Sequence, residues 1–557
     1  MRSGRILSSL RSMVDGLRSS NRRVWWTSFA MVTILCGLWA FANPPLAGPD
    51  EPSHVLRAVA LDRGQLTGRS LTPAFREQFK HDRLDYLLVR VPAFYASNAT
   101  SCFARVGNRT AECLRFTNST REVDGATYVA RHPPAYYAIV GVASRVTHPG
   151  TAALYLMRLI TAAITGALIA TAITALRRAA APKVLAVGLA FAITPMVLFV
   201  SSIVNPSGPE VAAAIAVWAC GLLVVSRAHE RVDRWLVGAT GIAGCVLAIT
   251  RQLGPLWLAL IALAFLGIAN RAALRNLARD NWARLWAFLI VGACLVQVAW
   301  NVIVKPLDVS RSGRARVNIS TTDILRIVTG RGFFRYKEMI GVFGWLDTPA
   351  PAATWLPWTA AVVFLFFAAV LWTSRRYVAV LFGLLAAVVI VPIAIESATY
   401  VDAGGLSWQG RYTLPLAVGI PILAAFALTT TERGRQLVTR RFLWVTGIVL
   451  AVAQALAFAQ NLRRYTVGYD GAVQFWKHPD WTPPLSPLLL TILFVLVIVA
   501  FVAWLLGAVP VGAGDADAAG SGENGGGSGQ DLVRNRRATH QYAASNASSG
   551  SSHAGSG

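Results

Sequence analysis

Long uncharged apolar stretches recur along this chain and are separated by short polar segments rich in arginine. The first is VWWTSFAMVTILCGLWAFAN, residues 24–43, and an α-helix needs about 20 apolar residues to cross a bilayer. Counting such stretches predicts an all-α polytopic membrane protein with about 12 transmembrane helices. The predicted spans lie near residues 24–43, 151–176, 184–204, 208–226, 235–250, 254–270, 284–303, 357–373, 377–399, 411–429, 442–460 and 485–509.

Basic residues fix the predicted orientation, because cytoplasmic loops carry an excess of lysine and arginine. Six arginines precede the first span, and alternate loops repeat the signal near residues 177–183, 227–234, 271–284, 375–376 and 433–441. This pattern predicts cytoplasmic N- and C-termini, with residues 1–23 forming a cytoplasmic arm. Residues 510–557 are rich in Gly, Ser and Ala, and we expect them to be a disordered cytoplasmic tail.

Composition supports the membrane assignment. Hydrophobic residues make up 55% and charged residues 14% of the 557 residues, whereas a soluble protein carries about a quarter charged residues. The net charge of +25 follows mainly from the cytoplasmic loops and calls for no nucleic-acid partner.

Two predicted extracytoplasmic loops are too long to be simple connections. Residues 44–150 contain apolar residues at helical spacing near 54–61 and again near 131–148, and we expect both segments to lie on the membrane surface. Cys102 and Cys113 lie in the same loop and are expected to form a disulfide in an oxidising compartment. Residues 304–356 have an excess of basic residues, which indicates either a phosphate-binding loop or a solvated one.

Acidic, basic and aromatic residues gather at the predicted extracytoplasmic ends of the spans. Asp50 and Glu51 follow the first span, where ionised groups are costly beside lipid. Taken alone, each such residue also fits a structural role, such as a helix cap, a turn or an interface anchor. The candidate substrate-binding residues are His54, Arg57, His132, Tyr137, Asn205, Arg251, Trp345, Asp347, Gln409, Arg411 and Tyr412.

Five segments in order resemble a family of bacterial predicted membrane proteins of unknown function. They are PDE..H..RA (49–58), HPP.YY (132–137), a TPM and NP pair within 194–206, GWLDT (344–348) and QGRY.LP (409–415). This family is similar to the GT-C superfamily of membrane glycosyltransferases. The resemblance covers about residues 24–505 and implies one transmembrane domain at 24–509. It implies a bacterial inner-membrane enzyme that transfers a sugar from a polyprenyl-phosphate donor, with inversion, on the extracytoplasmic face. The acceptor would be a cell-envelope glycan or protein.

The chemistry of such a transfer fits these residues. An acceptor hydroxyl needs a base, for which Asp50 is the first candidate and Glu51 the second. Arg251 and Arg411 are candidates for the departing phosphate, because guanidinium groups match phosphate oxygens. No motif demands a metal or another cofactor, although the carboxylate pair could hold a divalent cation. Two alternatives stay open: a transporter or flippase of a lipid-linked glycan, and a non-catalytic envelope-assembly protein.

Overall fold

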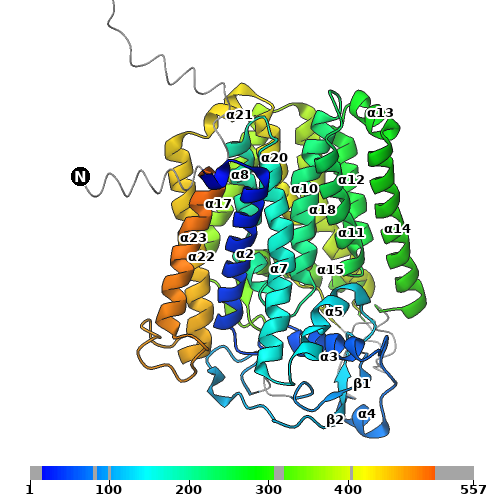
Figure 1. Ribbon diagram of the computed structural model, residues 1–557, viewed down its shortest axis with the longest axis vertical. Coiled ribbons are helices and arrows are strands. Elements are labelled where there is room, and N and C mark those ends of the chain that lie inside the picture. Colours follow the sequence, from blue (N-terminus) through cyan, green and yellow to red (C-terminus); the bar gives the residue numbers. More distant parts are fainter. Residues whose placement is uncertain (1–15, 80–84, 98–101, 307–318, 402–404, 508–557) are drawn as a thin grey trace, which may run out of the picture. The chain divides into compact units, whose positions relative to one another are not determined.

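A bundle of long, roughly parallel helices dominates the computed structural model (Figure 1). The structure describes residues 16–79, 85–97, 102–306, 319–401 and 405–507. The predicted disordered tail, most of the predicted N-terminal arm and residues 307–318 of the basic loop lie outside these ranges.

The helices that run along the bundle are α2 (Asn21–Ala42), α7 (Thr151–Leu176), α8 (Pro182–Ala192), α9 (Pro195–Val200), α10 (Ser207–Arg227), α11 (Arg234–Thr250), α12 (Gly254–Ile268), α14 (Asn281–Val304), α17 (Ala352–Trp372), α18 (Arg375–Thr399), α19 (Leu414–Ala417), α20 (Gly419–Thr429), α22 (Arg440–Val467) and α23 (Pro487–Gly507). The shorter elements at their ends are α3 (Glu51–Asp62), α4 (Pro73–Phe79), η2 (Ala111–Cys113), α5 (Pro134–Gly141), α6 (Ala143–Val146), α13 (Arg271–Arg279), α15 (Thr321–Gly330), α16 (Gly332–Gly341), η4 (Gly410–Thr413) and α21 (Glu432–Leu437).

These helices confirm the helical membrane architecture predicted from the apolar stretches. Among the described residues, nine helical segments are long and apolar enough to cross a membrane. The other three predicted spans coincide with shorter apolar helices, α8, α11 and α12. The stretch predicted as one span at 184–204 is broken at Thr194, which caps α9 through its side chain. The total of twelve is therefore not confirmed.

Apolar side chains remain exposed along the outside of the bundle. Phe288 and Ile303 of α14 are 74% and 78% exposed, and α18 presents Val389 and Ile390 in the same way. Apolar surfaces of this kind suit contact with the hydrocarbon of a membrane, whereas in water they would promote aggregation.

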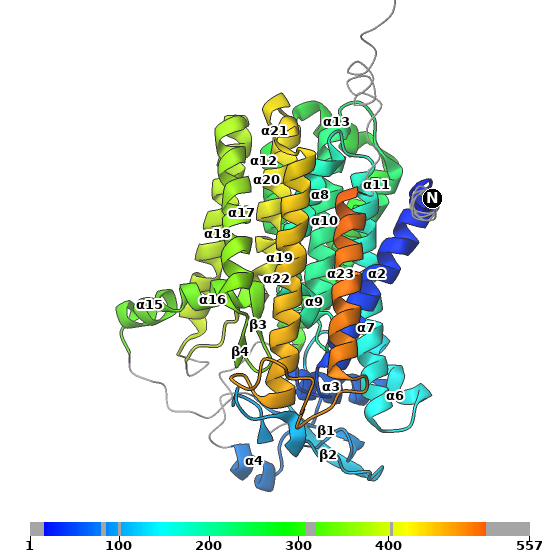
Figure 2. The same ribbon diagram turned by 90° about the vertical axis from the view of Figure 1, so that its left-hand side faces the viewer.

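Short elements of the first long loop gather at one end of the bundle, where α3, α4, α5 and two strands lie (Figures 1 and 2). Strand β1 (Leu87–Pro92) pairs antiparallel with β2 (Glu122–Thr127), from Leu87 opposite Thr127 to Pro92 opposite Glu122. Both expected short helices are present, as α3 and as the pair α5 and α6. The strands were not predicted. We call this end of the bundle the α3 end.

The opposite end of the bundle carries α13 and α21, together with the beginning of α2 (Figure 1). A second small hairpin, β3 (Val342–Phe343) with β4 (Thr348–Pro349), precedes α17. Because the arginine-rich connections and the long loops fall at opposite ends, the arrangement agrees with the alternation of loops in the sequence. The orientation in a membrane stays a prediction.

Candidate functional site

Asp50 lies at the first residue before α3 and directs its side chain toward a distant part of the chain. Its backbone is left-handed, with φ 64° and ψ 0°, a conformation that Asp and Asn tolerate better than most residues. The neighbouring Gly48 approaches Ile203 so closely that a Cβ would lie 2.6 Å from its Cδ1. After this tight turn, the side chains of Asp50 and Glu51 point in different directions.

The carboxylate of Asp50 forms an ion pair with Arg411, which lies 361 positions later on η4. The side chain of Arg411 is only 2% exposed, whereas that of Asp50 is 20% exposed and so stays accessible. Tyr128 also hydrogen-bonds to Asp50, and burial together with the charge of Asp50 raises the pKa of the Tyr128 hydroxyl. Tyr128 was not recognised from the sequence.

Arg251 lies beside Arg411, and the ring of Tyr412 connects them. The guanidinium carbon of Arg251 is 4.5 Å from the centre of that ring, and that of Arg411 is 5.1 Å away. Arg251 Nη1 also donates to Ser207 Oγ and to Glu210 Oε2, both at 3.1 Å. Two guanidinium groups and two carboxylates thus meet at the α3 end.

Some N–H groups of these arginines are left without partners. Nε and Nη1 of Arg411 and Nε of Arg251 are buried and find no hydrogen-bond acceptor among the described residues. Buried guanidinium nitrogens without acceptors are costly, so a bound anion at this position would satisfy them.

Two histidines flank Tyr137 in the same region. The Tyr137 hydroxyl lies 2.7 Å from His54 Nδ1 and 3.4 Å from His132 Nδ1. Burial and the positive charges of Arg411 and Arg251 lower the pKa of His54 well below its usual value. Burial, followed by the influence of His54 and Arg251, lowers the pKa of His132 in the same direction. Both imidazoles are therefore neutral at neutral pH.

Arg57 and Asn205 hold the backbone around this cluster. Arg57 donates to the carbonyls of Leu66, at 2.8 Å, and His132, at 2.9 Å. Burial lowers the pKa of Arg57 to about 10. Asn205 Nδ2 donates to the carbonyl of Pro49 at 3.1 Å, next to Asp50. These contacts stabilise the backbone segments that form the site.

Glu51 faces away from Asp50 and binds Arg158 inside the bundle. Arg158 Nε donates to Glu51 Oε1 and Nη2 donates to Oε2, both at 2.7 Å, and the two side chains are essentially unexposed. Glu51 also accepts from the backbone N–H groups of Val204, at 2.9 Å, and Gly48, at 3.0 Å. All the strong acceptor positions of Glu51 are thus occupied. The divalent cation suggested for the carboxylate pair stays a prediction.

Two buried glutamates hold the segment that carries Arg411. Glu396 Oε1 accepts from the backbone N–H groups of Ser407, at 2.9 Å, and Trp408, at 2.8 Å, and Glu396 also pairs with Arg335. Glu338 accepts from the N–H of Gly410. Sequence analysis missed both glutamates, although an acidic residue such as Glu396 inside an apolar span is a recognisable signal.

The close packing of this segment explains one glycine. A Cβ at Gly410 would lie 2.1 Å from the carbonyl oxygen of Arg335, so no larger residue fits there without a shift of α16. Gln409, the preceding residue, has a buried side-chain oxygen that finds no donor among the described residues. The segment therefore holds Arg411 against α16 while leaving one polar group of Gln409 free.

Trp345 and Asp347 lie in a different cluster. Asp347 pairs with the fully buried Arg464 at 2.8 Å. Arg464 also donates to the carbonyls of Phe103, at 2.8 Å, and Arg109, at 2.6 Å, and the ring of Trp345 lies 5.7 Å from the guanidinium carbon of Arg105. The structure thus joins these two candidates to the 102–113 segment of the first long loop and does not bring them into contact with Asp50 or Arg411.

The same segment contains the disulfide between Cys102 and Cys113. A group of three or more His, Cys, Asp or Glu side chains that could hold a metal ion is not found within the described ranges.

Two solved structures resemble the fold at low sequence identity. Both are of ArnT from Cupriavidus metallidurans, one bound to undecaprenyl phosphate and one in the apo state. The first has a TM-score of 0.36 and 17% identity and covers 87% of this chain and 77% of the other; the second has a TM-score of 0.35 and 15% identity and covers 88% and 77%. Comparison with the curated proteins finds no match. The family model described as "Predicted membrane protein (DUF2142)" matches residues 33–420, most of the membrane domain, and the chain therefore belongs to that family.

Proposed function

We propose that this protein is a membrane glycosyltransferase that moves a sugar from a polyprenyl-phosphate donor to a hydroxyl group of a cell-envelope acceptor. The observation that carries the proposal is the ion pair between Asp50 and Arg411, whose buried Nε and Nη1 find no acceptor in the described part of the chain. A carboxylate that can take a proton and a buried cation that can take a phosphate are the two groups such a transfer requires.

The donor phosphate binds at Arg411 and Arg251, because their positive charges and the N–H groups that have no acceptor among the described residues suit phosphate oxygens. A phosphate oxygen at Arg411 competes with the existing ion pair and loosens the hold of Arg411 on Asp50. Donor binding therefore frees the carboxylate of Asp50 to accept a proton from the acceptor hydroxyl.

Asp50 then accepts the proton of the acceptor hydroxyl. The acceptor oxygen bonds to the anomeric carbon of the sugar, while the bond from that carbon to the phosphate oxygen breaks. The polyprenyl phosphate leaves with both electrons of that bond, and the two arginines stabilise its added negative charge. Attack opposite to the leaving phosphate inverts the anomeric centre.

His54, His132 and Tyr137 supply hydroxyl and neutral imidazole groups beside the same cations. We assign them to the hydroxyl groups of the sugar, together with Tyr412 and Gln409. Glu51 binds Arg158 and Arg57 binds backbone carbonyls, and we assign both residues a structural role in positioning the site.

A transfer assay tests the proposal. Purified protein in detergent or vesicles is incubated with a panel of polyprenyl-phosphate-linked pentoses and hexoses, and free polyprenyl phosphate is measured. Release that depends on Asp50 and on an acceptor supports the proposal. Transport of the intact lipid-linked sugar across the vesicle, without release, contradicts it and supports a flippase.

A further inference from the structure

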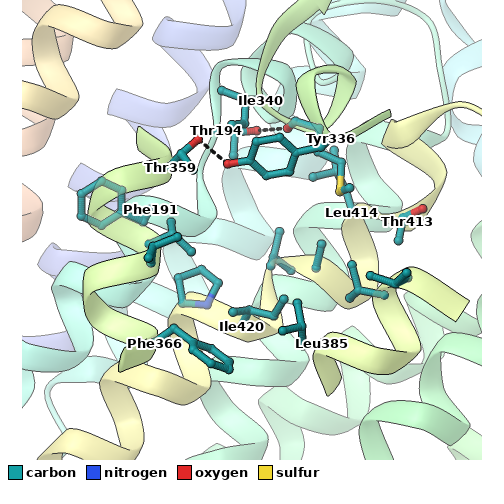
Figure 3. A pocket seen from close by; sticks show the side chains of 18 of the residues that line it. Phe191, Thr194, Tyr336, Ile340, Thr359, Phe366, Leu385, Thr413, Leu414 and Ile420 are labelled. Carbon is teal, nitrogen blue, oxygen red and sulfur yellow. Dashed lines mark hydrogen bonds between the residues drawn. The ribbon is translucent and has the colours of Figure 1, made fainter. Parts of the chain in front are cut away.

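An apolar chamber of about 480 Å³ lies beside the candidate site, between α16, α17, α18 and α20. Its volume is in the range of pockets that hold small ligands or segments of a chain. Phe191, Phe366, Leu385 and Ile420 line its apolar part (Figure 3). The chamber is not used by any step of the proposed transfer.

Polar groups are found toward one end of the chamber. The Tyr336 hydroxyl bonds to Thr359, and Thr194 donates to the carbonyl of Met339 at 2.9 Å (Figure 3). These polar groups are already paired with each other or with backbone. Arg335 and Thr413 also line the chamber, and they are paired with Glu396 and Trp408. The rest of the lining is apolar and would accept an apolar chain without leaving a polar group unsatisfied.

The chamber reaches the outside of the bundle between α17 and α18. Its lining includes Phe367, Phe382 and Val389, which are exposed on the surface of these two helices, and also Trp358 and Leu414, which are buried. Both helices are candidate membrane spans, so their exposed sides face hydrocarbon. A lipid chain can therefore enter sideways, without crossing water.

The chamber also touches the element that carries Arg411. Thr413 and Leu414 line it, and Arg411 lies two residues before Thr413 on η4. Arg335 lines the chamber as well, and Glu338 on the same helix holds the N–H of Gly410. One short turn thus separates an apolar space from a buried cation with unpaired N–H groups.

Arginines and glutamates lie together between α16 and Arg411. Burial raises the pKa of Glu338, and the nearby charges of Arg411, Arg331 and Arg335 oppose that rise. Glu338 is thus close enough to these three arginines for their charges to act on it. Arg335 is paired with Glu396, whereas Nε and Nη1 of Arg411 find no acceptor among the described residues, so Arg411 is the cation available to a phosphate attached to a chain inside the chamber.

We propose that this chamber binds the isoprenoid chain of the donor, in the part closest to the phosphate, and that the chain enters from the bilayer between α17 and α18. The inference rests on the proposed function and adds the location of the lipid. The chamber ends at the turn that carries Arg411, so a lipid with one chain can fill it and place its phosphate at that turn. A phospholipid, with two chains and a larger head group, fits less well.

Photo-crosslinking tests this location without any sugar transfer. The probe is a polyprenyl phosphate with a diazirine in the isoprene units nearest the phosphate, added to the full-length protein in vesicles. Mass mapping is expected to find labels on chamber residues of α17 and α18, such as Phe366 and Leu385. Excess unlabelled polyprenyl phosphate should remove the labels, and excess phosphatidylglycerol should not.

Two variants narrow the chamber. Ala417→Phe places a ring against its wall, and Val389→Trp narrows the opening on the exposed side of α18, where folding should be unaffected. Each is expected to weaken probe binding at least about tenfold, which corresponds to about 1.4 kcal/mol. Ala386→Phe is the matched control, because Ala386 is exposed on α18 and does not line the chamber.

Three results would overturn the inference: labels outside the chamber, equal displacement by phospholipid, or unchanged binding in both narrowing variants. A protein that transfers sugar but shows any of these results keeps the proposed function and loses only this location. A protein that is labelled in the chamber and transfers no sugar keeps the lipid site and loses the transferase.

Discussion

Replacing Asp50 with asparagine separates the chemical role of this carboxylate from its place in the fold. Asn has nearly the same shape and tolerates the left-handed backbone that residue 50 adopts. Its side-chain oxygen can still accept a hydrogen bond from Arg411 or Tyr128. What the variant loses is the negative charge and the ability to take a proton.

The expected effect on turnover follows from that loss. A general base contributes a factor of about 10² to 10⁴, which equals about 2.7–5.4 kcal/mol in the activation barrier. The variant leaves Arg411, which is 2% exposed, without its counter-ion, so some stability is lost. The loss should be smaller than for the enclosed pair of Glu51 and Arg158, because Asp50 is 20% exposed and water can reach it.

The assay measures release of polyprenyl phosphate by wild-type and Asp50→Asn protein in the same vesicles. Thermal unfolding and the binding of sugar-free polyprenyl phosphate are measured alongside as controls. We expect turnover to fall by the factor given above while the variant stays folded and binds the lipid. Wild-type turnover by the folded variant would refute the role of Asp50 as base.

The remaining predictions concern stability and covalent structure. Glu51→Gln leaves Arg158 as a buried charge without its counter-ion, so we expect a loss of about 3–5 kcal/mol in thermal or denaturant unfolding; unchanged stability would contradict the structural role of Glu51. Because the pKa of His54 is lowered in the folded protein, the unfolded state binds more protons below about pH 6.5, and stability should fall as the pH decreases through that value. His54→Gln should reduce the slope and leave the part that comes from His132, whose pKa is lowered in the same direction; an unchanged slope would show that His54 does not contribute. Mass mapping under non-reducing conditions should find Cys102 linked to Cys113, and free thiols at both positions would contradict the disulfide.

The helical bundle could be predicted from the sequence because bilayer thickness sets the length of an apolar stretch. Nine of the predicted spans match long apolar helices of the described chain, and α7 has the predicted bounds. The break at Thr194 was not predicted from hydropathy, although Pro195 directly after it is a helix-breaking signal inside the apolar stretch. Hydropathy reports the environment of a residue and not the local path of the backbone.

The different partners of Asp50 and Glu51 could not be predicted from the sequence. The two acids are adjacent and chemically similar, yet one faces Arg411 and the other is enclosed with Arg158. The left-handed residue at the start of α3 causes this divergence. Neither the turn nor the identity of the partner 361 positions away can be read from residue types.

The supporting groups were missed for a related reason. Glu338 and Glu396 act on backbone N–H groups of residues 407–410, and a backbone donor leaves no mark in the sequence. Tyr128 lies in the turn that follows β2, where no periodic pattern marks it. Trp345 and Asp347, in contrast, belong to a motif that looked functional and that the structure joins to Arg464 and the 102–113 segment.

The most direct test of the account is the binding of sugar-free polyprenyl phosphate to wild-type protein and to Arg411→Ala. We expect the lipid phosphate to bind Arg411, whose buried Nε and Nη1 find no acceptor among the described residues. A charge-assisted hydrogen bond to phosphate is worth about 1.5–3 kcal/mol, so binding should weaken by about 10- to 150-fold. A folded Arg411→Ala protein that binds polyprenyl phosphate as tightly as wild type would contradict the account.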